Sequence, residues 1–424
     1  MRRYLLCLLF AVSASAATRS DWKLLLRPLV KGRNFSGAVL VARDGRVVSN
    51  DAFGDANVEL SVPSTPDTKF YIGSISKSFT AHAILLLRDD GKLALDDPVS
   101  RFVPDFPRGE GITIRQLLRH ESGLAQNTTS ASYFEQATHA YSTEEAVAAF
   151  RNAPRPAAPG ERRIYANPNY TLLALIAERA SGQSFSAFLS GRIFAPLHLR
   201  NTGNHTSWSG IVPRRAAGYA VTGESNLTNA RYYDYSIGTG AGSLYSTTGD
   251  LFKWVQFVTS RPELQDYAWS SRDVSGDSVR MAIGWDGAGF SAATLYDPAR
   301  RIAVVVLSNM NVASMAETVA LGVFASVTGK PSRLPRIDER PLPPATAAAL
   351  AGHYRLGSDF YVPDTELDIV ADGGMLFEQQ KNGDRIALLR IGDREFLHRS
   401  SWGRIVFLDD GRLRFYDRFI ATRT

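Results

Sequence analysis

Apolar residues form short runs at both ends of the first two thirds of the chain and follow a helical period between them. Residues 37–54, GAVLVARDGRVVSNDAFG, predict two strands joined at Asp44-Gly45, a dipeptide typical of tight hairpins. Residues 290–310 predict a second pair of strands. Because strands lie at the two ends and helices in the middle, we expect one antiparallel sheet, flanked by helices, with an inserted helical subdomain.

Helical periodicity marks the interior of this region. In 74–88 the apolar residues fall on one face, and Gly91 follows where a glycine commonly ends a helix. Thr247 and Asp250 have the spacing of a capping box ahead of another helix, although its usual acid is Glu. Further helices are predicted over 113–119, 168–181 and 313–327.

The pattern changes near residue 330. Residues 330–348, KPSRLPRIDERPLPPATAA, contain five prolines and predict a linker over 330–345. From 346 to 424, short alternating segments are separated by turn dipeptides such as Asn382-Gly383. Turn signals at intervals of roughly ten residues predict a small all-β barrel or sandwich. The predicted fold class is therefore α/β (α+β), followed by a separate β-barrel domain.

Residues 1–17 have the order of a secretory signal peptide. Two arginines precede an apolar run, and small residues ending near Ala16 or Ala17 follow it. The run is too short for a membrane anchor, which takes about 20 residues. We expect cleavage, no membrane span afterwards, and a periplasmic or secreted protein. The only cysteine, Cys7, would be removed, which leaves no disulfide and no thiolate metal ligand.

Composition narrows the classes of function. With 44% hydrophobic and 21% charged residues, the chain is typical of globular proteins. Its formal charge of +6 is scattered without a long basic run, so we expect no nucleic-acid partner. The histidines are dispersed without the spacing of metal ligands, so no metal site is expected.

Ser74 and Lys77 stand three residues apart at the junction of a predicted strand and helix. Residues at this spacing share a helix face, so the Lys77 amine can lie beside the Ser74 hydroxyl. A serine becomes a nucleophile only when a neighbour takes its proton, and a lysine does so only if its pKa is lowered. Taken alone, the pair also fits a solvated first turn of a helix.

A second candidate, Tyr165-Ala166-Asn167, lies just before another predicted helix. A phenol can relay a proton, and an amide can hold a lysine amine or a substrate carbonyl. Ser-x-x-Lys followed some 90 residues later by Tyr-x-Asn resembles the penicillin-recognising serine hydrolases. The version with Tyr-x-Asn is similar to the class C β-lactamase branch, which includes D-alanyl-D-alanine carboxypeptidases and family VIII esterases.

The resemblance covers roughly residues 25 to 327, so 18–329 is predicted to be a β-lactamase-like hydrolase domain. The segment 346–424 resembles the lipocalin-like modules appended to some of these hydrolases. The resemblance implies that Ser74 attacks a carbonyl, that Lys77 and Tyr165 share the proton transfer, and that Asn167 orients Lys77 or the substrate.

The third motif of that family, usually Lys-Thr-Gly or His-x-Gly, is altered. Its best match is Trp285-Asp286-Gly287, which resembles the Trp-x-Gly of family VIII esterases. By this match the backbone N–H of Ala288 would be the second oxyanion donor, beside that of Ser74. A lysine at this motif helps to hold a substrate carboxylate, whereas tryptophan offers an apolar wall. The departure therefore favours neutral ester or amide substrates.

The leading interpretation is an exported serine hydrolase that forms an acyl-enzyme on Ser74 with a small ester or amide. This acyl-enzyme chemistry implies no cofactor. A D-amino-acid peptidase or D-Ala-D-Ala carboxypeptidase, and a β-lactamase, are the alternatives among enzymes. A binding protein that keeps the fold without catalysis is the alternative of another class. Lys381-Asn382-Gly383 imitates Lys-Thr-Gly but predicts a hairpin turn beyond the linker, and His120 is interpreted as structural.

Overall fold

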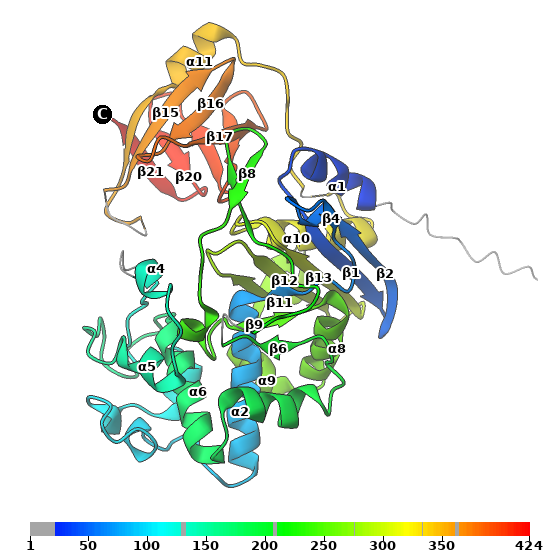
Figure 1. Ribbon diagram of the computed structural model, residues 1–424. Helices are drawn as coiled ribbons and strands as arrows, with labels where there is room; N and C mark the ends of the chain where they lie inside the picture. Colours follow the sequence, from blue (N-terminus) through cyan, green and yellow to red (C-terminus); the bar gives the residue numbers. More distant parts are fainter. Residues whose placement is uncertain (1–21, 129–132, 207–209, 275, 333, 361–363) are drawn as a thin grey trace, which may run out of the picture.

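The computed structural model describes residues 22–128, 133–206, 210–274, 276–332, 334–360 and 364–424. The predicted signal peptide, 1–17, lies outside these residues. A six-stranded antiparallel sheet, ordered β10-β11-β12-β13-β1-β2, forms the centre of the larger part (Figure 1). Its strands are β1 (Gly37–Arg43), β2 (Arg46–Phe53), β10 (Ser270–Val274), β11 (Asp277–Trp285), β12 (Ser291–Asp297) and β13 (Ile302–Ser308). The pairing of β1 with β13 confirms that the two ends of this region share one sheet.

Both faces of the sheet are buried. Along β1, Ala38 and Leu40 belong to one hydrophobic cluster and Val39 and Val41 to another, because successive side chains point to opposite faces. The helices on the first face include α2 (Ser76–Asp89) and α8 (Thr248–Thr259). Those on the second face are α1 (Trp22–Lys31) and α10 (Met315–Val327) (Figure 1).

The helical subdomain lies between β2 and β10 in the sequence. Its main helix, α6 (Asn167–Ser181), packs against α2. The shorter helices are α3 (Ile114–Leu118), α4 (Tyr133–Gln136), α5 (Thr143–Ala148), α7 (Phe185–Leu189) and α9 (Pro262–Ala268). At the start of α8 the Thr247 side chain accepts the Asp250 N–H, but the Asp250 carboxylate accepts the Asn201 N–H instead. Only half of the predicted capping box therefore forms.

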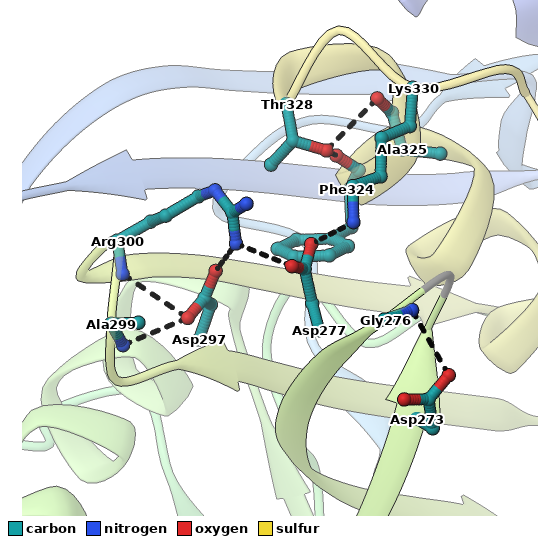
Figure 2. Close-up of polar contacts among 10 residues, drawn as sticks. All are labelled: Asp273, Gly276, Asp277, Asp297, Ala299, Arg300, Phe324, Ala325, Thr328 and Lys330. Atoms are coloured by element: carbon teal, nitrogen blue, oxygen red, sulfur yellow. Dashed lines mark hydrogen bonds and ion pairs between the residues drawn. The ribbon is translucent and has the colours of Figure 1, made fainter.

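An ion-pair cluster joins the start of β11 and the turn after β12 to the segment that follows α10. The Arg300 guanidinium lies 2.8 Å from the Asp277 carboxylate and 3.0 Å from that of Asp297, and the Lys330 ammonium also pairs with Asp277 (Figure 2). Both carboxylates are largely buried, with Asp277 11% and Asp297 1% exposed, whereas the Arg300 side chain is 41% exposed. The first residue of the predicted linker, Lys330, is thus attached to the sheet.

The C-terminal strands form a closed eight-stranded barrel, as the alternating pattern predicts. They are β14 (Gly352–Leu356), β15 (Glu366–Asp372), β16 (Met375–Gln379), β17 (Arg385–Arg390), β18 (Glu395–His398), β19 (Arg404–Phe407), β20 (Leu413–Phe415) and β21 (Phe419–Arg423). Leu376, Leu388 and Phe396 fill the interior, where Leu342 from the predicted linker joins them. A short helix, α11 (Pro344–Leu350), begins inside that linker. In the described part of the chain, no helix is both long and apolar enough to cross a membrane.

The barrel packs against the larger part through its outer face. Leu389, Leu397 and Trp402 share a hydrophobic cluster with residues of α1, α10 and the sheet. The hairpin of β7 (Tyr219–Thr222) and β8 (Asn226–Asn229) reaches from the sheet to the barrel between them (Figure 1).

Candidate active site

Ser74 lies in a tight 3-10 turn, Gly73–Ile75, directly before α2. The turn follows the short strand β5 (Phe70–Tyr71), which pairs with β9 (Leu244–Ser246). Gly73 has a φ of 48°, and a Cβ atom there would lie 2.8 Å from the backbone nitrogen of Trp285. Glycine is required at this position because both the backbone angle and the close strand exclude a side chain.

The structure brings four predicted residues together around the Ser74 hydroxyl. The Tyr165 hydroxyl lies 2.7 Å from Ser74 Oγ, and Lys77 Nζ donates to Ser74 Oγ at 2.9 Å. Lys77 Nζ also donates to Asn167 Oδ1 at 2.8 Å. These residues come from two segments. The turn before α2 and α2 itself carry Ser74 and Lys77, and the chain at the start of α6 carries Tyr165 and Asn167. All four line a cavity of about 630 Å³.

Lys77 is only 4% exposed, and each of its three hydrogen-bonding directions is used. Its third partner is the Ala241 carbonyl oxygen, at 2.8 Å. Ala241 lies in the glycine-rich stretch 238–242, and a backbone carbonyl of this kind leaves no signal in the sequence. Burial lowers the pKa of Lys77, and the neighbouring Tyr165 partly opposes this by favouring the ammonium.

Two opposing effects act on the pKa of the Tyr165 phenol. Burial raises the pKa of its phenol, but the Lys77 charge and the hydrogen bonds from Lys77 and Ser74 outweigh this and hold the pKa below its ordinary value. The Tyr165 phenol, which lies beside Ser74, therefore loses its proton more readily than an ordinary tyrosine does.

His120 supports the Tyr165 ring from behind. The two ring centroids are 4.6 Å apart, and His120 Nδ1 accepts the Ala166 N–H at 3.2 Å and the Asn169 side-chain amide at 3.1 Å. Burial lowers the pKa of His120 to about 3, so the imidazole is neutral. An acceptor role for Nδ1 places its proton on Nε2. This neutral, buried ring positions the loop that carries Tyr165.

The predicted third motif requires a correction. The Ala288 N–H donates to Asp286 Oδ1 at 2.8 Å, so it is not available to a substrate oxyanion. Gly287 lies in the turn after β11, and a Cβ there would face Phe134 rather than Ser74. The same Asp286 carboxylate accepts the Phe290 N–H and the Tyr235 hydroxyl. The Asp286 carboxylate thus holds the turn of Asp286, Gly287 and Ala288 together, and Asp286 itself lines the cavity.

Gly284 is the glycine that meets the serine turn. A Cβ atom at Gly284 would lie 1.9 Å from the Ile72 carbonyl oxygen and 3.0 Å from the Ser74 nitrogen. The Asp286 N–H points toward β12, where it donates to the Phe290 carbonyl at 3.4 Å. Because N–H groups alternate sides along a strand, the Trp285 N–H points the other way, toward the turn of Ser74. The Ser74 and Trp285 N–H groups are therefore neighbours.

Apolar side chains form one wall of the cavity. Ile283 and Trp285 are 44% and 48% exposed and lie on the same face of β11. The Trp285 indole N–H donates to Asn311 Oδ1 at 2.7 Å, which holds the ring in place. Phe134 and Tyr233 also line the cavity. Their positions depend on tertiary contacts, and no local pattern in the sequence identified them.

Comparison with known proteins agrees with this geometry. The sequence pattern of the β-lactamase family matches residues 22–323. The chain is 27% identical to a putative penicillin-binding protein, PbpX, of Bacillus subtilis, over 66% of this chain and 72% of PbpX. It is 28% identical to the protein flp of Staphylococcus aureus, over 68% of this chain but only 62% of flp.

Two solved structures share the fold. An octameric penicillin-binding protein homologue from Pyrococcus abyssi has a TM-score of 0.66 and 24% identity, over 95% of this chain and 99% of that one. A D-amino acid amidase from Ochrobactrum anthropi has a TM-score of 0.62 and 22% identity, over 70% of this chain and 94% of that one. Since the family pattern spans well over half of the chain, this protein belongs to the β-lactamase family of serine hydrolases.

Proposed function

We propose that this protein hydrolyses small neutral esters or amides through an acyl-enzyme on Ser74. The observation that carries the proposal is the position of Ser74 Oγ, 2.7 Å from the Tyr165 hydroxyl and 2.9 Å from Lys77 Nζ, in an open cavity. A serine hydroxyl next to a proton acceptor and a fixed cation is the arrangement that nucleophilic catalysis needs.

In the proposed reaction, Lys77 and Tyr165 titrate as a pair that has lost one proton. Ser74 Oγ attacks the substrate carbonyl and its proton passes to the Tyr165 phenolate, which then gives it to the leaving alcohol or amine. In the second half, Tyr165 takes a proton from water, the water oxygen displaces Ser74 from the acyl carbon, and Tyr165 returns that proton to the departing Ser74 Oγ. Lys77 remains an ammonium, held by Asn167 and the Ala241 carbonyl, and its positive charge stabilises the Tyr165 phenolate.

The N–H groups of Ser74 and Trp285 are the proposed oxyanion donors. They flank the contact between the serine turn and β11, which is where a carbonyl oxygen would point during attack by Ser74 Oγ. Backbone N–H groups fixed in this way stabilise the transition state more than the substrate. In this proposal Trp285 acts through its backbone N–H as well as through its ring.

The substrate preference rests on what replaces the usual lysine. Ile283 and Trp285 present apolar surface beside the nucleophile, and neither can bind a carboxylate. An apolar acyl group would bury area against them, whereas an anionic group placed against these two side chains would lose hydration without a cation in contact. The proposal therefore favours neutral esters and amides over penicillins and peptides that end in a free carboxylate.

Hydrolysis of p-nitrophenyl butyrate, D-phenylalanine amide, a D-Ala-D-Ala peptide and nitrocefin by the full chain tests this proposal. We expect the ester to give the highest kcat/KM and Ser74→Ala to abolish turnover of every substrate. A dominant rate on nitrocefin or the peptide would overturn the substrate preference. Turnover that survives Ser74→Ala would overturn the assignment of the nucleophile.

We also propose that the hydrolase is exported, on the strength of the pattern in residues 1–17. Mass measurement of the protein recovered from the periplasm or the medium of a bacterial host should give a chain that begins near residue 17 or 18. Recovery of only uncleaved chain in the cytoplasm would contradict export without affecting the catalytic proposal.

A further inference from the structure

Arg399 is a fully buried arginine in the barrel, in the turn after β18. Its Nε donates to Asn34 Oδ1 at 2.9 Å, and Nη2 donates to the Arg33 carbonyl at 3.1 Å. Its Nη1 donates to the carbonyl oxygens of Thr222, Gly223 and Asn226. One barrel side chain thus binds the segment after α1 and both sides of the β7–β8 turn.

These hydrogen-bond partners are neutral, and no ion pair of Arg399 occurs among the described residues. Burial lowers the pKa of Arg399 to about 10, which still leaves it charged at neutral pH. A buried cation is tolerated only when its donors are satisfied, so the surrounding carbonyls must stay in place around it. Arg399 therefore acts as a clamp on the β7–β8 turn.

Backbone contacts reinforce the clamp. The Gly223 N–H donates to the Arg385 carbonyl at 2.6 Å, and the Ala387 N–H donates to the Gly223 carbonyl at 3.2 Å. The Thr222 hydroxyl also donates to the Arg385 carbonyl, at 3.3 Å. The tip of the hairpin is in this way joined to β17 of the barrel.

The base of the same hairpin leads into the active-site cavity on both sides. At the start of β7, the Asn311 N–H donates to the Tyr219 carbonyl at 2.7 Å, and the Asn311 side chain holds the Trp285 indole. After β8, the chain continues to Tyr233, which lines the cavity, and its hydroxyl lies 2.6 Å from that of Tyr133. The hairpin thus connects the barrel clamp to two aromatic residues of the cleft.

We propose that Arg399 is a positioning residue through which the barrel sets the apolar wall of the active site. It touches neither Ser74 nor the cavity, and acts through the β7–β8 hairpin on Trp285 and Tyr233. The inference rests on the proposed hydrolase function and adds that the barrel determines how well large apolar acyl groups bind. Small acyl groups do not reach these aromatic residues, so their binding should not change when the hydrogen bonds of Arg399 are lost.

The test compares p-nitrophenyl acetate with p-nitrophenyl phenylacetate in the full chain. For Arg399→Met, which keeps the volume and removes the donors, we expect KM for the phenylacetate ester to rise about 10-fold. KM and kcat for the acetate should stay within about 2-fold of the unmodified protein. Arg399→Lys, which keeps a donor at this position, should raise KM for the phenylacetate ester less than Arg399→Met does. Arg412→Met, which removes an exposed barrel arginine, is the matched control and should change neither substrate.

Hydrogen exchange provides a readout that does not require activity. Arg399→Met should increase amide exchange in residues 219–235 and leave helix α2 unchanged. Equal changes for both esters, or unchanged exchange in 219–235, would overturn the proposal.

If Arg399→Met does not fold, Thr222→Val provides the test, because it removes only the hydroxyl bond to Arg385. It should raise KM for the phenylacetate ester, but not for the acetate, by a smaller factor than is expected for Arg399→Met. A protein that hydrolyses neither ester refutes the proposed function, whereas the exchange result still decides whether the clamp operates.

Discussion

Gly284 of β11 lies directly against the turn that carries Ser74. A Cβ atom on Gly284 would sit 1.9 Å from the Ile72 carbonyl oxygen and 3.0 Å from the Ser74 nitrogen. This contact leaves no room for any side chain, and it brings the Ser74 and Trp285 N–H groups together. The geometry of the proposed oxyanion site therefore depends on Gly284 as well as on Gly73.

Replacing Gly284 by alanine should reduce kcat by about 100-fold or more, the usual effect of losing one oxyanion donor. The added methyl must push β11 away from the serine turn, because backbone atoms and not a flexible side chain stand in its way. Gly191→Ala, where no atom lies within 4 Å of the new methyl, is the control and should keep full activity. Steady-state kinetics on an ester measures both. Normal activity in Gly284→Ala would show that β11 supplies no donor.

Removing the Tyr165 hydroxyl should cost more in kcat than in KM. Tyr165→Phe keeps the ring against His120 but takes away the group that exchanges a proton with Ser74, so we expect a loss of about 10²–10⁴-fold in kcat. Tyr232→Phe, at a tyrosine that is 53% exposed, should leave activity intact. If Tyr165→Phe turns over at the normal rate, Lys77 alone must be the base.

The pH dependence should reflect the Lys77–Tyr165 pair. Since the active form has lost one proton, kcat/KM should rise with pH and reach a plateau below pH 10, because the Tyr165 pKa is held below its ordinary value. The Arg163 charge is one of the effects that lower this pKa. Arg163→Gln should therefore shift the profile to higher pH.

Arg162→Gln is the matched control for that shift, since Arg162 is also exposed and donates to the Pro156 carbonyl instead. Its profile should coincide with that of the unmodified protein. A shift of the Arg163→Gln profile toward lower pH would contradict the requirement for a deprotonated phenol.

Acid should destabilise the protein partly through His82 of α2. Its ring packs 4.8 Å from that of Phe257, and burial lowers the pKa of His82 to about 4. Between about pH 6.5, the ordinary value, and pH 4, the unfolded chain binds this proton and the folded chain does not, so stability falls as the pH falls. The loss is about 1.4 kcal/mol per pH unit for one histidine.

His82→Leu removes this proton and keeps an apolar side chain at the site. The melting temperature of the variant should therefore fall less steeply between pH 7 and pH 5 than that of the unmodified protein. Parallel curves for the two proteins would mean that the pKa of His82 is the same in the folded and the unfolded chain.

The sequence predicted the parts of the site that depend on local spacing. Ser74 and Lys77 are three residues apart on one helical turn, so their contact follows from helix geometry alone. The placement of Tyr165 beside them came from the resemblance, because nothing local to residue 165 indicates what lies across the cleft. The larger sheet was predicted from its buried strands, which contain long apolar runs on both faces.

Gly284, and not the predicted Gly287, meets the serine turn for a physical reason. Gly284 and Gly287 flank the same tryptophan, and only the close approach of the Ile72 carbonyl distinguishes them. The Asp286 side chain then closes its own turn and occupies the Ala288 N–H. The clamp at Arg399 was equally hidden, since its partners at 33–34 and 222–226 are distant in sequence.

Covalent labelling tests the central claim most directly. After incubation of the full chain with a fluorophosphonate probe, the account predicts a mass increase of one probe per protein, located on the peptide that contains Ser74 and absent in Ser74→Ala. A folded protein that stays unlabelled, or that carries the probe on another residue, would contradict acyl transfer at this site.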